Sequence, residues 1–208
     1  FSVIQKNLIV RYDPETGASE EWRTNTARTN GLMFDAQGRL YGCCIAKQAI
    51  VRFEQSGDMT TIAHSLEGKR LNTPNDLAID RKGRIWFSNP WNTKVALPDQ
   101  KREMEDEPAV LLDSRPDGSW SVIRAASDLS NPNGILISQD ERTMYVSQCD
   151  YRVDRPRELR AYEILADGRL GRYVVLHTFG QDYRGVHRPI DGMCLDAEGN
   201  IVATAGWT

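Results

Sequence analysis

The stretch LNTPNDLAIDRKGRIWFSNP, residues 71–90, places an Asn–Asp pair after a proline and before a short apolar segment, a charged turn and a second apolar segment. The same order recurs in residues 29–44 (TNGLMFDAQGRLYGCC), 131–148 (NPNGILISQDERTMYVSQ) and 189–205 (PIDGMCLDAEGNIVATA). Each copy starts with an amide or carboxylate residue followed by Gly or Asp. Repetition of this kind predicts an architecture built from one repeated unit, so it decides the fold.

The residues that lead the four copies are Asn30, Asn75, Asn133 and Asp191, and 45, 58 and 58 positions separate them. Three of the four turns between the apolar segments contain a glycine, which adopts positive φ at low cost. The segments outside the copies supply further strand pairs with turn residues at their tips. These hairpins are expected at residues 8–22, 49–63, 109–123 and 158–176.

Four strands in each unit of roughly 40 to 60 residues are typical of a β-propeller blade. The sequence therefore predicts an all-β protein in which residues 1–208 form a single β-propeller domain. At roughly 50 residues for each blade, the chain holds about four blades. It begins inside a hairpin with Phe1 and stops soon after a repeat strand, so we expect the domain to be incomplete at both ends.

The composition excludes several classes of protein. The formal net charge of −3 argues against a nucleic-acid partner, and no apolar run approaches the ~18 residues of a membrane helix. The four cysteines lack C-x-x-C spacing, which disfavours a zinc site. Burial in strands is the preferred interpretation of these cysteines over a disulfide framework. We expect a soluble protein, with cytoplasmic and periplasmic compartments both open and the oligomeric state unknown.

One polar stretch, WNTKVALPDQKREMEDEPA at residues 91–109, interrupts the second copy. It is expected to be a surface loop, and a lid over the site is the alternative to a simple solvated insertion. The residue that leads each copy enters the innermost strand of its blade, so all four should point toward one common axis. A ring of side-chain oxygens suits a hard cation such as Ca²⁺ or Mg²⁺.

Residues 67–90, 131–150 and 189–207 together resemble the gluconolactonase/regucalcin (senescence marker protein 30)/luciferin-regenerating-enzyme family. The resemblance implies a six-bladed β-propeller with one divalent cation in its central tunnel. It also implies lactone hydrolysis. Ca²⁺ is the expected cation, with Mg²⁺ or Zn²⁺ as alternatives, and the expected partner is a small-molecule substrate.

The resemblance places Asn75, Asn133 and Asp191 at positions that serve the family's metal site, and Asp191 also at its base or nucleophile. A fourth ligand, a glutamate in an EGP-like motif of the first blade, has no counterpart in this sequence. The candidate substrate contacts are Asn30, Arg70, His187 and Arg188, although each has a structural alternative such as a turn, a surface ion pair or an exposed rim position.

Three functions remain open at this point. The first is a metal-dependent lactonase of the gluconolactonase type, in which the cation polarises the lactone carbonyl and Asp191 assists attack by water. The second is a catalytically silent propeller that acts as a binding module or scaffold, because one fold hosts many functions. The third is a hydrolase that resembles phosphotriesterases and uses the same metal.

Overall fold

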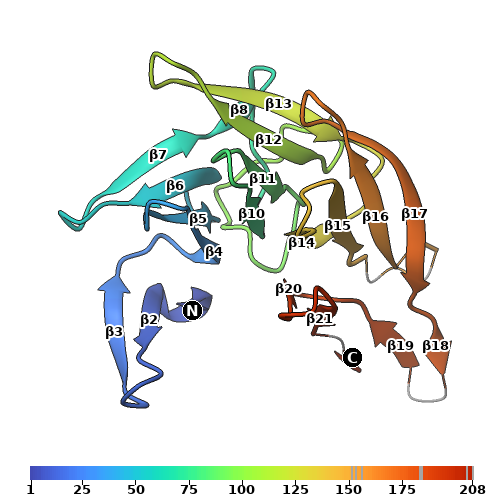
Figure 1. Cartoon of the computed structure of the whole chain (residues 1–208), viewed down its shortest axis with the longest axis horizontal. Helices are drawn as coiled ribbons and strands as arrows, with labels where there is room; N and C mark the ends of the chain where they lie inside the picture. Colours follow the sequence, from blue (N-terminus) through green and yellow to red (C-terminus); the bar gives the residue numbers. More distant parts are fainter. Residues whose placement is uncertain (151, 153, 156, 183–184, 205, 208) are drawn as a thin grey trace.

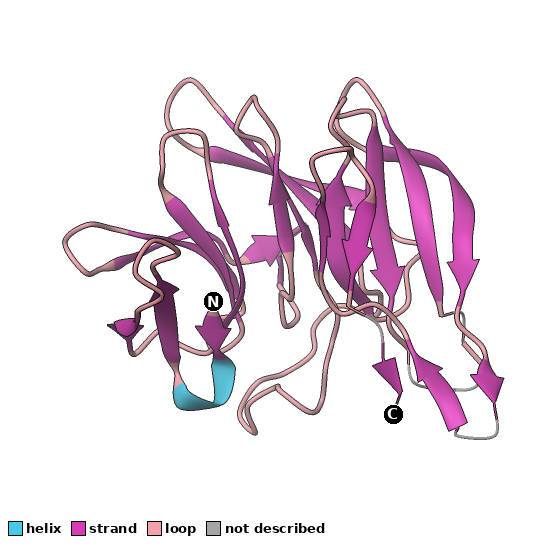
Figure 2. Cartoon of the chain, turned by 60° about the horizontal axis from the view of Figure 1, so that its bottom comes forward, coloured by secondary structure: helices cyan, strands magenta, loops and turns pink. Residues whose placement is uncertain are grey.

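The computed structural model describes residues 1–150, 152, 154–155, 157–182, 185–204 and 206–207. Its sheets are arranged like a fan around a common centre, with β4, β10, β14 and β20 nearest that centre (Figure 1). Strands supply nearly all of the regular structure, and η1 (Ile4–Lys6) is a single short helical turn (Figure 2). The described helix is too short to cross a membrane. The predicted all-β propeller architecture is thus observed, while a single domain over 1–208 stays a prediction.

Three sheets of the described chain have four antiparallel strands each, in sequence order from the centre outward. The first contains β4 (Thr29–Phe34), β5 (Leu40–Cys44), β6 (Ala49–Phe53) and β7 (Met59–Ala63). The second contains β10 (Leu77–Ile79), β11 (Ile85–Ser88), β12 (Ala109–Ser114) and β13 (Trp120–Ala126). The third contains β14 (Pro132–Ile137), β15 (Thr143–Gln148), β16 (Glu158–Ile164) and β17 (Leu170–Thr178). The copies led by Asn30, Asn75 and Asn133 and the hairpins predicted at 49–63, 109–123 and 158–176 therefore fall on these blades.

Smaller sheets flank the three blades. On the N-terminal side lie β1 (Ser2–Val3), β2 (Leu8–Tyr12) and β3 (Ser19–Thr24). On the C-terminal side lie β18 (Gln181–Asp182), β19 (Gly185–Arg188), β20 (Met193–Leu195), β21 (Ile201–Ala203) and β22 (Gly206–Trp207). The short hairpin β8 (Ser65–Leu66) and β9 (Lys69–Arg70) precedes the second blade. The fourth copy forms the pair β20–β21.

An aspartate closes the tight turn between the first two strands in the first and second blades and in the β20–β21 pair, whereas Ser138 takes that place in the third blade. In the second blade, Asp80 accepts hydrogen bonds from the backbone N–H groups of Lys82 and Arg84 at 3.0 and 2.8 Å, and from the Nε of Arg84 at 2.8 Å. Gly83 has φ of 82°, as the sequence predicts for the turn glycine. These contacts join residues at most four positions apart, so this turn is a locally complete unit.

Side chains packed between adjacent blades form the core. Cys43 and Cys44 contribute to different apolar clusters because successive strand residues point to opposite faces. Trp86 is fully buried, and its indole N–H donates to the Gly168 carbonyl at 2.9 Å, which links the second blade to the third. The expectation of buried cysteines holds for Cys43, Cys44 and Cys149 but is wrong for Cys194, which is exposed on β20.

The segment between β11 and β12 has no strand or helix in the described structure, as expected of a loop. It is nonetheless anchored, because Met104 is buried in the cluster that also contains Cys43. The amide of Gln100 donates to the carbonyl of Ile45 at 2.7 Å. The loop is therefore held against the first blade, and its role as a lid stays a prediction.

Candidate metal and active site

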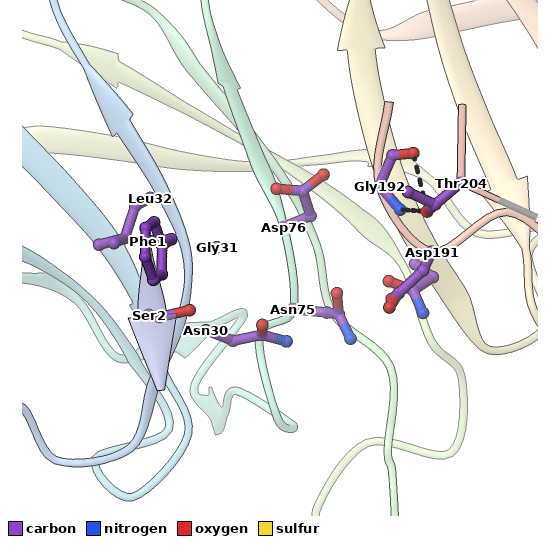
Figure 3. Close-up of a pocket in the computed structure, with 11 residues that line it drawn as sticks. Phe1, Ser2, Asn30, Gly31, Leu32, Asn75, Asp76, Asp191, Gly192 and Thr204 are labelled. Atoms are coloured by element: carbon purple, nitrogen blue, oxygen red, sulfur yellow. Dashed lines mark hydrogen bonds between the residues drawn. The ribbon is translucent and has the colours of Figure 1, made fainter. Parts of the chain in front are cut away.

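The four residues that lead the repeats line one pocket of about 410 Å³ (Figure 3). We call Asn30, Asn75, Asn133 and Asp191 the ring residues, and the cavity the ring pocket. Asn30 and Asn133 belong to β4 and β14, whereas Asn75 and Asp191 lie just before β10 and β20. Each one thus enters an innermost strand, which is why residues 45 to 58 positions apart meet. The predicted convergence of these side chains agrees with the structure.

Three of the four ring residues carry a side-chain amide. The described chain contains no group of three or more His, Cys, Asp or Glu side chains that could hold a metal ion. A cation here would instead meet the amides of Asn75 and Asn133 beside the carboxylate of Asp191. Such a mixed oxygen set fits Ca²⁺ or Mg²⁺ better than Zn²⁺, which prefers nitrogen and sulfur.

The Oδ1 atom of Asn133 is buried and makes no hydrogen bond in the described structure. A buried amide oxygen without a partner costs free energy, and a bound ion, water or ligand would remove that cost. Asn133 also lines the ring pocket. The donor set and this oxygen together fit an oxygen-binding cation.

A second carboxylate, Asp76, was missed as a site residue from the sequence. It lines the ring pocket, and in Figure 3 its carboxyl lies between Gly31 and Asp191. Its Oδ1 accepts from the Leu77 N–H at 2.9 Å, and its Oδ2 accepts from the Ile135 N–H of the third blade at 3.2 Å. The Asn–Asp pair in residues 75–76 was the available signal, but only the first member of the pair was interpreted.

The surroundings of Asp76 disfavour its charge. Burial, with a smaller contribution from the nearby Asp191 carboxylate, raises the pKa of the carboxyl to about 6, although the two backbone N–H groups act in the opposite direction. A cation in the ring pocket would favour the ionised form. The pocket therefore concentrates acidic groups where a divalent cation would relieve their repulsion.

Adjacent blades approach each other closely at the ring. The N–H of Gly31 donates to the Asn75 carbonyl at 2.8 Å. A Cβ atom on Gly31 would lie 2.7 Å from that oxygen, and one on Gly134 would lie 2.6 Å from the Asp191 carbonyl oxygen. Glycine is therefore required after Asn30 and Asn133 because the next blade fills the space a side chain would need.

Two of the other predicted substrate contacts, Arg70 and His187, lie outside the ring pocket. Arg70 is exposed on β9, and its guanidinium donates to the Lys47 carbonyl at 3.0 Å. His187 and Arg188 lie on β19, opposite Trp207 and Gly206 of β22. Neither Arg70 nor His187 is among the described residues that line the ring pocket, and the side chain of Arg188 lies outside the part of the chain that the structure describes. Their contact with a substrate stays a prediction, whereas Asn30 lines the pocket.

The sequence is similar to that of characterised proteins. A gluconolactonase of Zymomonas mobilis is 28% identical over 181 residues, which cover 85% of this chain and 49% of that protein. The chain thus spans about half the length of this relative. A gluconolactonase of Xanthomonas campestris with a solved structure is 31% identical, with a TM-score of 0.78 over 97% of this chain and 63% of that one.

The fold extends to more distant proteins. A calcium-binding protein of Agrobacterium tumefaciens, regucalcin, matches with a TM-score of 0.67 at 18% identity, covering 97% of this chain and 61% of that one. The family described as the SMP-30/gluconolactonase/LRE-like region matches residues 1–208. Since the match spans the whole sequence, the chain belongs to the SMP-30/gluconolactonase/LRE-like family.

Proposed function

We propose that the protein hydrolyses a lactone of the sugar-lactone type in the ring pocket, with one divalent cation, by preference Ca²⁺, held by Asn75, Asn133 and Asp191. The observation that carries the proposal is the buried Asn133 Oδ1, which has no hydrogen-bond partner in the described structure and belongs to a pocket with two further candidate ligands. Family membership and the similarity to two gluconolactonases support a lactone as the substrate class.

The pocket has a suitable size and polarity for such a substrate. Its volume of about 410 Å³ falls within the range of small-molecule sites. Asn30 offers an amide donor and acceptor at the wall opposite Asp191 (Figure 3), where it could orient a substrate hydroxyl. When bound, the cation would polarise the lactone carbonyl and stabilise the negative charge that develops on its oxygen.

Asp191 is the proposed acid–base residue. It is the more exposed of the two carboxylates in the pocket, and its backbone is fixed by a hydrogen bond from its N–H to the Thr204 carbonyl at 3.2 Å. An exposed carboxylate can accept a proton from an attacking water. Asp76 is less suited to this role because both of its oxygens already accept backbone hydrogen bonds.

The test combines calcium calorimetry with hydrolysis of gluconolactone for this chain and its Asp191→Asn variant. Asp196→Asn is the matched control, since Asp196 closes the turn after β20 and lies outside the ring pocket. We expect calcium binding and hydrolysis in the parent chain and the control, and neither in Asp191→Asn. Turnover retained in Asp191→Asn would reject its role.

The same measurements separate the alternative functions. Calcium binding without hydrolysis of any lactone or ester would favour a binding module or scaffold. Cleavage of a fluorophosphate ester but of no lactone would favour a hydrolase similar to phosphotriesterases. Either result would overturn the lactonase proposal.

A further inference from the structure

Hydroxyl or thiol side chains recur on the second strand of each repeat copy, or directly after it, close to the ring. They follow the ring residues by 13, 13, 14 and 13 positions, and they are Cys43, Ser88, Ser147 and Thr204. The spacing depends on the length of the turn that separates the two strands of each copy. It is one position longer in the third copy because the turn there has one more residue. A recurrent small polar side chain in an otherwise apolar strand calls for a polar partner, because buried hydroxyl groups are nearly always hydrogen-bonded.

Ser88 connects the ring residues of two blades. Its side chain is fully buried, and its Oγ donates to the Asn133 carbonyl at 2.6 Å. The same Oγ accepts from the N–H of Asp76 at 3.1 Å. One hydroxyl therefore joins the Asn75–Asp76 pair to the backbone of the candidate ligand Asn133, which lies 45 positions away from Ser88.

Ser147 makes the corresponding contact one blade further on. It is fully buried, and its Oγ donates to the carbonyl of Ile190 at 2.8 Å. Ile190 directly precedes Asp191, so this hydroxyl fixes the backbone that carries the proposed acid–base residue. The contact repeats the geometry of Ser88, from the second strand of one blade to the ring segment of the next.

Cys43 and Thr204, which occupy the equivalent positions in the first and fourth copies, make different contacts from those of Ser88 and Ser147. Cys43 is fully buried, and burial together with the nearby Asp76 carboxylate raises the pKa of its thiol well above the ordinary value, so the group stays a neutral S–H. Thr204 instead holds its own ring segment, with its Oγ1 accepting from the Gly192 N–H at 2.9 Å. All four side chains thus lie beside a ring segment.

We propose that Ser88 and Ser147 are positioning residues, whose hydroxyl groups hold the next blade's ring segment so that Asn133 and Asp191 keep a common orientation in the pocket. Each hydroxyl acts through a backbone carbonyl and does not touch a ligand. The part of this inference that concerns cation binding rests on the proposed function. The part that concerns blade alignment stands on the hydrogen bonds alone.

Calcium affinity, measured by calorimetry, tests the first part. Loss of one buried hydrogen bond that leaves its carbonyl unpaired should weaken calcium binding about tenfold in Ser88→Ala and in Ser147→Ala. Ser138→Ala is the matched control, because it removes two hydrogen bonds at the opposite end of β14 without touching the ring. The control should bind calcium within about twofold of the parent chain.

A rescue variant distinguishes positioning from general loss of stability. Ser88→Cys places at this position the residue that the first blade carries there, a weaker donor of similar size. It should recover most of the lost affinity. Equal affinity losses in Ser88→Ala and Ser138→Ala, or an absence of any recovery in Ser88→Cys, would overturn the positioning role.

Hydrogen exchange of the Ile135 amide tests the second part without any metal or substrate. This N–H donates to the Asp76 carboxylate and not to Ser88, so it reports the alignment of the second and third blades. Its exchange should be about tenfold faster in Ser88→Ala than in Ser138→Ala. Unchanged exchange would refute the inference, whereas faster exchange in a chain that binds no calcium would reject only the proposed metal site.

Discussion

Substituting Gly31 by alanine should separate the first two blades at the ring. The new Cβ would lie 2.7 Å from both the Asn75 carbonyl oxygen and the Asp76 Cα, and 2.8 Å from the Asp76 Oδ1. Ordinary van der Waals contact begins near 3.4 Å, so the blades must move apart by several tenths of an ångström or more. Two of the three obstructing atoms belong to the backbone and cannot rotate away.

The magnitude follows from two contributions. Overpacking at a rigid contact costs about 1–3 kcal/mol, and weakening of the 2.8 Å hydrogen bond between Gly31 and Asn75 adds about 0.5–1.5 kcal/mol. A total near 2–4 kcal/mol lowers the Tm of a chain of this length by about 4–15 °C. Because the movement occurs beside Asn75, calcium binding should weaken as well.

Thermal unfolding followed by circular dichroism measures the effect, with Gly192→Ala as the matched control. Gly192 also follows a ring residue, but a Cβ there would meet nothing within 4 Å in this structure. The control should melt within about 2 °C of the parent chain. If Gly31→Ala melted as the control does, the close approach of the blades would not be the reason for glycine at this position.

Three further perturbations test other parts of the molecule. Asn133→Ala should weaken calcium binding more than tenfold with little change in Tm, and unchanged affinity in a titration would remove Asn133 from the ligand set. In Asp76 the folded-state pKa of about 6 lies above the ordinary 3.8, so its contribution to stability is present below pH 3.8 and lost as the pH rises toward 6. As the pH rises across this window, the unfolding free energy of Asp76→Asn should therefore increase relative to that of the parent chain, by at most about 3 kcal/mol. Denaturant titrations at several pH values measure this difference between the two chains. A difference that does not change with pH would contradict the raised pKa. Met104→Ala should lower the unfolding free energy by about 2–5 kcal/mol and release the loop between β11 and β12. If a protease cleaved that loop no faster than in the parent chain, Met104 would not be its anchor.

The repeat pattern carried most of the predictable information about fold and site. The spacing of Asn30, Asn75, Asn133 and Asp191 was sufficient to predict blades and a common axis, because one residue at the same place in each blade must face the centre. The positive φ of the turn glycines could also be predicted, because it depends only on the conformation of the turn itself. In the turn of the third copy, which has no glycine, Glu141 adopts a φ of 57°. The preferences of residues in turns do not predict a glutamate in this conformation.

Contacts between blades were not predictable in the same way. Ser88 and Asn133 are 45 positions apart, and the sequence around neither residue predicts their hydrogen bond. Asp76 was not predicted as a site residue, because its bond to Ile135 appears only when two blades are side by side. Arg70 was expected either to contact a substrate or to form a surface ion pair, and the β8–β9 hairpin carries it to an exposed position.

The closed turns of the blades have a consequence for the order of folding. Asp35, Asp80 and Asp196 each secure a hairpin through partners at most four positions away, and such local structure forms early because little chain entropy opposes it. The ring pocket draws on segments 45 to 58 residues apart and must assemble after the hairpins. In a refolding experiment, the circular dichroism signal of the backbone should therefore recover before the ability to bind calcium. The interval between the two would measure how long one folded blade takes to pack against the next.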